Sequence, residues 1–275
     1  MSLTGVPRQS PVAAAGAAII AFWIVVALLA PALAPFSPTR SFVTMAPPGT
    51  VTPDGRFLLG TDNLGRDILS RIIFGARTVL VYAPAATLCA YLFGVIGGVV
   101  AGYRGGVIDE VLSRVGDAVL AFPVLVLYIL IVNRFGASGT NIVIATTLAS
   151  GPGIMRLVRG LVLDLRDRAY VQAAETRGEP GWWIMLVEIL PNARGPLIVD
   201  LCLRLGYVTI AIGTLGFLGV GLPPPTPDWG GMIYEGRQFA TVFPHIIVFP
   251  CIAVSSLVLG FNLLADGLRE LAAGD

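Results

Sequence analysis

Few side chains in this sequence could perform chemistry. Residues 136–139, Gly-Ala-Ser-Gly, fit a G-x-S-G nucleophile motif around Ser138, and His245 is the single histidine available as its base. Together they predict an intramembrane serine protease. We do not favour this hypothesis, because four small residues arise easily by chance in a chain with 33 glycines and because His245 follows a proline at the edge of an apolar segment.

The remaining reactive residues exclude several other mechanisms. All 18 basic residues are arginine, which excludes a P-loop lysine, a Schiff-base lysine and a Ser-Lys dyad. If ATP powers this protein, another chain must bind it. Cys89, Cys202 and Cys251 lie in or near apolar stretches without metal-ligand spacing, where cysteine packs as a small hydrophobic residue. We therefore expect no catalytic residue, metal site or cofactor in this chain, and the net charge of +1 gives no reason to expect nucleic acid.

The composition is that of an integral membrane protein. Of the 275 residues, 55% are hydrophobic and 13% charged, and the mean hydropathy is +0.81, whereas a soluble domain needs more polar surface. About 20 apolar residues cross a bilayer core. The first apolar segment is too long for a signal peptide, so we expect it to be retained. The sequence predicts an all-α membrane protein with six transmembrane helices, over residues 12–33, 78–101, 118–133, 141–158, 196–220 and 246–265.

The distribution of arginine predicts the orientation of these spans, because loops on the inner side carry an excess of basic residues. With the N-terminus inside, ten arginines lie on the inner side and seven on the outer side. Five of the outer seven fall in one long first loop, which the rule weights less. We therefore expect both termini in the cytoplasm. The inner set is Arg8, Arg104, Arg114, Arg156, Arg159, Arg166, Arg168, Arg177, Arg194 and Arg269.

The long first loop, residues 34–77, divides into two parts. Residues 35–53 are proline-rich, and residues 59–71 predict a turn followed by a short amphipathic helix that Thr61 or Asp62 could cap. We expect a solvated connector on the membrane surface. The expected organisation is an N-terminal unit of one span and this loop, residues 1–77, followed by a core of five spans, residues 78–275, with a cytoplasmic hairpin near residues 160–194.

One ionisable pair lies inside a predicted span. Asp200 and Arg204 are four residues apart, so they share a helix face and can pair. An ionisable group in a membrane is a functional candidate by default. We favour a pair that neutralises itself at a subunit interface over one that lines a transport pathway.

A polar segment, residues 170–192, separates two long apolar stretches in the second half of the chain. Ala173 and Ala174 would let a helix lie close against the surface of a partner. Two tryptophans at the centre of the segment could instead anchor it among lipid headgroups. We favour a docking element over a surface anchor.

The same segment contains residues that typically begin and end the two helices of a helical hairpin. Gly178 can take the left-handed conformation that ends a first helix. Pro180 suits the first turn of a second helix, and Pro191 with Asn192 would close it.

Four stretches in order resemble the oligopeptide/dipeptide/nickel family of binding-protein-dependent ABC importer permeases, in its second-permease subtype. Residues 28–38 match the end of that subtype's first helix, and residues 59–77 match its Leu-Gly-Thr-Asp-x-x-Gly-Arg-Asp signature. Residues 170–192 match the cytoplasmic coupling loop, whose pattern is Glu-Ala-Ala, three residues, Gly, nine residues, Ile, one residue, Leu-Pro. Residues 215–230 with 261–269 match the C-terminal pattern.

The resemblance implies a type I ABC importer permease in a bacterial inner membrane. Its expected partners are a second permease, two ATPase subunits that bind ATP and Mg²⁺, and an extracytoplasmic binding protein. The implied solute is a short peptide, with nickel or another small solute as the alternative. The resemblance assigns coupling to the ATPases to Tyr170, Gln172, Ala173, Ala174, Gly178, Leu190 and Pro191.

Three residues of the coupling loop depart from the family pattern. Gln172 replaces the first glutamate, Arg177 stands where a leucine is common, and Glu188 occupies the usual isoleucine position. Gln172 keeps the length and the hydrogen-bonding capacity but loses the charge, so an anion that meets a partner arginine is in doubt.

A second alternative is an ion-coupled secondary transporter. Such folds often contain two related halves with broken helices. The first three and the last three predicted spans show no repeat, and the embedded charges are few. We therefore favour the ABC importer.

Overall fold

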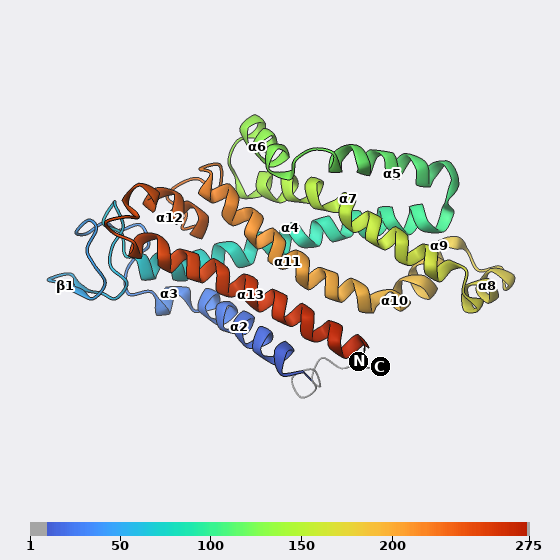
Figure 1. Cartoon of the computed structure of the whole chain (residues 1–275), viewed down its shortest axis with the longest axis horizontal. Coiled ribbons are helices and arrows are strands. Elements are labelled where there is room, and N and C mark those ends of the chain that lie inside the picture. The colour runs from blue at the N-terminus through green and yellow to red at the C-terminus, as the bar shows by residue number, and fades with distance from the viewer. Residues whose placement is uncertain (1–9, 274–275) are drawn as a thin grey trace.

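Five helices in the described residues, 10–273, are long and apolar enough to cross a membrane. In the computed structural model they run side by side along the long axis (Figure 1). Five of the six predicted spans are thus confirmed as long helices. Arg8, which was one of the arginines used to predict the orientation, lies outside the described residues. The five are α2 (Pro11–Leu28), α4 (Ile68–Arg104), α7 (Gly139–Arg166), α11 (Arg194–Phe217) and α13 (His245–Ala273).

The predicted third span, residues 118–133, is not one continuous helix. It is divided between α5 (Gly106–Leu120) and α6 (Val124–Phe135), whose axes differ by 85°. Pro123 lies at the break, in an extended conformation. Proline lacks the N–H of the helical ladder and disfavours helical geometry in the residue before it. The described residues thus contain five continuous spans, and a sixth only if this bent pair counts as one.

The second span begins earlier than predicted. α4 starts at Ile68 rather than Thr78, because the Asp67 carboxylate caps it by accepting a hydrogen bond from the Ser70 backbone N–H at 2.8 Å. The predicted separate amphipathic helix, with its cap at Thr61 or Asp62, is wrong: residues 59–67 are not helical, and residues 68–71 form the first turn of α4. The boundary between residues 77 and 78 falls inside this helix.

Shorter elements gather at the two ends of the bundle. We call these the loop end, which carries β1 and α12, and the hairpin end, which carries α8 and α9 (Figure 1). The strands pair antiparallel, with Thr50 opposite Phe57. The shorter elements are α3 (Ala30–Leu33), β1 (Thr50–Thr52), β2 (Gly55–Phe57), α8 (Ala169–Thr176), α9 (Gly181–Trp183), a π-helix (Ile184–Ile189), α10 (Leu190–Asn192), α12 (Trp229–Gly236) and a 3₁₀ turn (Arg237–Phe239).

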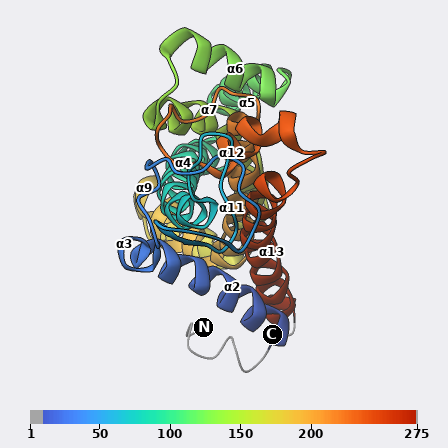
Figure 2. The ribbon, with the colours of Figure 1, turned by 90° about the vertical axis from the view of Figure 1, so that its left-hand side faces the viewer.

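Helices α2 and α13 pack antiparallel, which brings the beginning of the first to the end of the last. The Ser10 hydroxyl donates to a Glu270 carboxylate oxygen at 3.2 Å, and the Trp23 indole N–H donates to the Ser256 hydroxyl at 3.0 Å. Figure 2 looks along the bundle from the loop end and places α4 between α5–α7 and α2. The beginning of α2 and the end of α13 therefore lie on the same side of the bundle.

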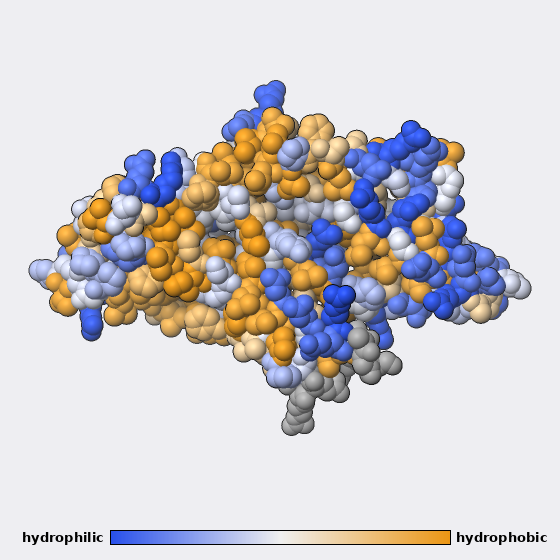
Figure 3. All heavy atoms as spheres, in the orientation of Figure 1, coloured by the Kyte–Doolittle hydropathy of each residue, from blue (hydrophilic) through white to orange (hydrophobic). Residues whose placement is uncertain are grey.

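The face seen in Figure 3 is hydrophobic between the two ends and hydrophilic around the hairpin end. Exposed apolar side chains such as Leu28, Leu92 and Ile252 lie on the long helices. Exposed apolar side chains along the long helices fit a hydrocarbon environment.

The most extensive helix packing joins α4 to α7, through a stripe of glycines. Gly94 and Gly98 face α7; a Cβ atom added to either would lie 2.6 Å from Cβ of Ile154 or Val158, respectively. Membrane helices gain no hydrophobic driving force from lipid, so small residues that permit close backbone approach stabilise their association. Gly102 extends the stripe by one turn, against Val162.

We predict that Gly98→Leu forces α4 and α7 apart. Overpacking of this kind costs about 1–3 kcal/mol, so the melting temperature of the purified protein in detergent should fall. Gly160→Leu is the matched control, because Gly160 is exposed on α7 and a Cβ atom there meets nothing within 4 Å. Equal melting temperatures for the two variants would contradict the proposed role of the glycine stripe.

Candidate functional site

The hairpin, residues 169–192, begins with a helix that ends as predicted. Gly178 has φ +76° and lies directly after the last turn of α8. Its N–H donates to the Glu175 carbonyl at 2.9 Å, and the Glu179 N–H donates to the Ala174 carbonyl at 3.2 Å. These two hydrogen bonds form a Schellman motif, whose left-handed position favours glycine. The angle between the two arms is therefore fixed by backbone geometry.

The last helix of the second arm ends at Asn192, where Pro191 and Asn192 were predicted to close it, and the next span follows after one residue. A π-helical stretch leads into α10, and α11 starts at Arg194 after Ala193. Pro191 is at the beginning of α10, where no backbone N–H is needed. The Asn192 amide donates to the Glu188 carbonyl at 2.6 Å, within this stretch. The hairpin is thus joined to α11 by near-continuous helical backbone.

Ala173 and Ala174 face in opposite directions. Ala174 is fully buried and packs with Val171, Ile184 and Ile189 in a core cluster shared with α4 and α7. Ala173 is exposed, as are Gln172 and Pro191, whereas Tyr170 and Leu190 are half-buried. The expectation that both alanines are available to a partner is therefore corrected, because Ala174 packs against its own chain.

Two of the residues that depart from the family pattern contact each other across the hairpin. A guanidinium nitrogen of Arg177, at the end of α8, lies 3.5 Å from a carboxylate oxygen of Glu188, in the π-helix. Arg177 also lies 3.9 Å from Glu179. The third, Gln172, donates its side-chain amide to the Asp167 carbonyl at 3.3 Å. The charged departures therefore link the two arms.

The predicted intramembrane pair is present and has a third member. Arg204 Nε lies 3.3 Å from Asp200 Oδ2 on the same face of α11. The Tyr91 hydroxyl, on α4, donates to the same oxygen. The Arg204 guanidinium lies beside Gly153 of α7. The pair thus lies where α4, α7 and α11 meet, and sequence spacing could not identify Tyr91 because it is 109 residues from Asp200.

A second group of charges at the loop end was not expected. Asp62, Arg66, Arg71 and Glu235 form a connected ion network that ties the first loop to α12. Arg66 Nε lies 2.8 Å and Arg71 Nη1 2.5 Å from Asp62 Oδ2, and the two arginines lie 2.5 and 3.0 Å from Glu235 Oε2. The side chains of Asp62, Arg66 and Arg71 are 3–7% exposed.

This burial corrects the expectation that the loop is a solvated connector. Removal of one partner from a buried ion pair leaves an uncompensated charge and typically costs about 3–5 kcal/mol. A sequence signal for the network existed in part, because Asp62 and Arg66 are four residues apart. The contribution of Glu235 could not be predicted from local sequence spacing, because Glu235 is 169 residues from Arg66.

Asp228 extends the polar region beside the ion network. It is 3% exposed and caps α12, its Oδ2 accepting from the Gly231 N–H at 2.8 Å. Its Oδ1 has no hydrogen-bond partner among the described residues. A cavity of about 110 Å³ borders Asp228, Arg71 and Glu235. Burial raises the pKa of Asp228 to about 6.

The serine protease hypothesis finds no geometry to support it. The Ser138 hydroxyl oxygen accepts a hydrogen bond from the Asn141 backbone N–H and so caps α7. His245 Nε2 is buried and has no hydrogen-bond partner in the described part of the chain. The two side chains are therefore not joined as nucleophile and base.

We predict that Asp228 makes stability depend on pH. Its pKa in the folded protein, about 6, exceeds the ordinary value of 3.8, so folding disfavours the ionised form. The stabilising contribution is fully present below the unfolded pKa and is lost as the pH rises through about 6, a change of order 1–3 kcal/mol. Melting temperatures of wild type and Asp228→Asn, measured between about pH 5 and pH 7.5, check this; the variant should lack this component, and parallel curves would contradict it.

Comparisons with known proteins identify the family to which this chain belongs. Residues 94–273 match the family described as binding-protein-dependent transport system inner membrane component. The chain is 37% identical over 266 residues to the dipeptide transport system permease protein DppC of Haemophilus influenzae, covering 96% of this chain and 90% of that protein. It is 38% identical over 218 residues to the glutathione transport system permease protein GsiD of Pectobacterium atrosepticum, covering 79% of this chain and 72% of that protein.

A solved structure shares the fold. A chain of the MetNI methionine ABC transporter, in an inward-facing conformation, superimposes with a TM-score of 0.62 at 15% identity, covering 74% of this chain and 96% of that one. This likeness confirms the predicted type I importer bundle. Permeases of this kind are transport subunits and not enzymes. The chain belongs to the inner-membrane components of binding-protein-dependent transport systems, within the peptide and nickel group of ABC importer permeases.

Proposed function

We propose that this chain is one of two permease subunits of an ATP-driven importer of short peptides. The observation that carries the proposal is the hairpin: a geometrically fixed element at one end of the bundle with an exposed face around Ala173. Two ATPase subunits, which bind ATP and Mg²⁺, dock on the hairpins of this chain and of a second permease. A solute-binding protein delivers the peptide from the other side of the membrane.

The packing of the hairpin supports its use as a lever. Its buried face is part of one core cluster with α4 and α7, and its second arm continues into α11. When the ATPases close on ATP, displacement of residues 170–190 would therefore move three spans together. Nucleotide then shifts the bundle between inward-facing and outward-facing arrangements, a two-state equilibrium.

The proposed orientation places the hairpin and both termini in the cytoplasm. The antiparallel packing of α2 and α13 supports a common side for the two ends of the chain, and the arginine distribution supports the cytoplasm as that side. The loop end then faces outward, where the binding protein docks. The hydrophobic middle of the bundle lies in the bacterial inner membrane.

The names of similar proteins support a peptide as the solute. They include dipeptide, di/tripeptide and glutathione permeases. Nickel or another small solute is the alternative within the same group. The Asp200–Arg204 pair is half-buried and bonded to Tyr91, which favours a structural role at the junction of three helices over a direct role in solute binding.

We predict that Ala173→Trp prevents the ATPase subunits from copurifying with the permease and abolishes ATP-dependent uptake of radiolabelled dialanine. The added ring fills space that a packed interface does not have. The amount and melting temperature of the permease itself should not change, because Ala173 is exposed. Ala174→Trp is the contrast: Ala174 is fully buried, so the permease itself should lose stability. Full copurification and full uptake with Ala173→Trp would overturn docking at this face.

We predict the orientation from single cysteines in a background in which the three native cysteines are replaced. A cysteine at Glu179, in the hairpin, should react with an impermeant maleimide only when the cytoplasmic side is exposed. A cysteine at Asp54, in the turn between β1 and β2, should react only from outside. Both side chains are accessible to solvent in part. The reverse pattern would overturn the orientation.

A further inference from the structure

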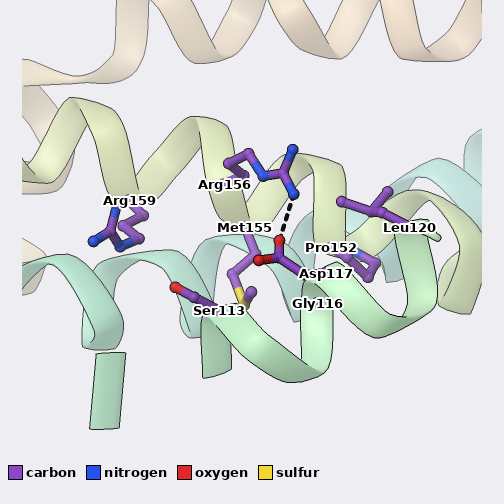
Figure 4. A pocket seen from close by; sticks show the side chains of 8 residues that line it. All are labelled: Ser113, Gly116, Asp117, Leu120, Pro152, Met155, Arg156 and Arg159. Atoms are coloured by element: carbon purple, nitrogen blue, oxygen red, sulfur yellow. Dashed lines mark hydrogen bonds and ion pairs between the residues drawn. The ribbon is translucent and has the colours of Figure 1, made fainter. Parts of the chain in front are cut away.

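A second polar cavity, distinct from the hairpin and from the loop-end network, lies between α5 and α7. Its volume is about 350 Å³, within the range of small-molecule sites. Figure 4 shows Asp117 and Arg156 facing each other across it, with Met155 and Gly116 beside them. The lining residues are Ser113, Gly116, Asp117, Leu120, Pro152, Met155, Arg156 and Arg159.

The charges around this cavity come in two pairs of different character. Arg159 is held by Asp109, with Nη2 and Oδ2 2.6 Å apart, and Asp109 also accepts from the Ser113 hydroxyl at 3.2 Å. Arg156 and Asp117 lie 2.5 Å apart, but their side chains are 62% and 63% exposed. An exposed pair of this kind contributes only about 0–1 kcal/mol. The Asp117–Arg156 pair can therefore open at little cost and offer each charge to a ligand.

The position of this pair argues against contact with lipid. Arg156 belongs to α7, 17 residues from its beginning at Gly139 and therefore about 26 Å along the helix. Charged groups within membrane spans face protein or water rather than hydrocarbon. Asp117 and Arg156 therefore face water or another subunit rather than hydrocarbon, in the half of α7 nearer the hairpin (Figure 1).

The charges around the cavity indicate which kind of ligand it can bind. Two carboxylates and two guanidinium groups give the site no net charge, so it offers no excess attraction to a phosphate or to a metal cation. When the Asp117–Arg156 pair opens, it presents one negative and one positive pole, with the apolar surfaces of Leu120, Pro152 and Met155 beside them. A small zwitterion with an apolar body is complementary to this arrangement.

We propose that this cavity is a transient binding site for a short peptide within the transporter, with Asp117 binding the α-ammonium group and Arg156 the α-carboxylate. This site rests on the proposed function as a peptide importer. Opening of one exposed ion pair and formation of two, one at each end of the peptide, is the recognition step. Because the original pair re-forms when the peptide leaves, binding is weak enough for release.

The test uses the complete transporter with its binding protein in proteoliposomes. Uptake of radiolabelled dialanine is compared with uptake of N-acetyl-dialanine and of dialanine amide for each variant. Because the binding protein is the same in every arm, its own preference cancels when each variant's ratio of free to blocked peptide is divided by that of wild type. The matched controls are Glu110→Gln and Arg114→Gln, which break a neighbouring exposed pair of α5 that does not line the cavity.

For Asp117→Asn, the ratio of free to N-acetylated peptide should fall about tenfold relative to wild type, the typical loss of one hydrogen bond to a charged group. For Arg156→Gln, the ratio of free to amidated peptide should fall by a similar factor. A merely structural pair would lower uptake of all peptides equally and leave both ratios unchanged, and that result, or ratios that match those of the controls, would overturn the site. Failure of the wild-type transporter to import any of the three peptides would instead overturn the proposed function.

Discussion

The close contact between α4 and α7 is the interaction on which the rest of this structure depends. It exists because Gly94, Gly98 and Gly102 allow the two backbones to approach, which is how helices associate where lipid provides no hydrophobic driving force. α4 begins at the loop-end ion network and ends beside the hairpin, and α7 leads directly into α8. The loop-end network and the hairpin are therefore connected through one tightly packed pair of helices, which is what the proposed lever requires.

Three groups of charges lie along this pair, and their burial determines what each can do. The loop-end network is buried and internally paired, so it resists rearrangement and holds the first loop to α12. The Asp200–Arg204 pair is half-buried and bonded to Tyr91, which joins α11 to α4. The Asp117–Arg156 pair is mostly exposed and lines a cavity. Only the last pair can exchange partners at low cost, since the free energy lost on opening an ion pair falls as solvent access rises.

Local signals in the sequence predicted local features. Apolar length predicted the five long spans, the i, i+4 spacing predicted the Asp200–Arg204 pair, and Gly178 predicted the end of α8. Tertiary contacts overrode the rest. The loop-end network needed Glu235, which is distant in sequence, and the burial of Ala174 depends on the π-helix that packs over it. The break before α6 had a visible signal in Pro123, but a hydrophobic window averages across such a residue.

The departures from the family pattern in the hairpin are best understood as a pair. Separately, an arginine in place of leucine and a glutamate in place of isoleucine would each add an unpaired charge to the hairpin. Arg177 and Glu188 lie 3.5 Å apart, so the two added charges pair with each other. Its free energy is small because Arg177 is 56% exposed. The Schellman motif at Gly178 therefore sets the angle of the arms, and the ion pair contributes mainly by preventing two unpaired charges from facing each other across them.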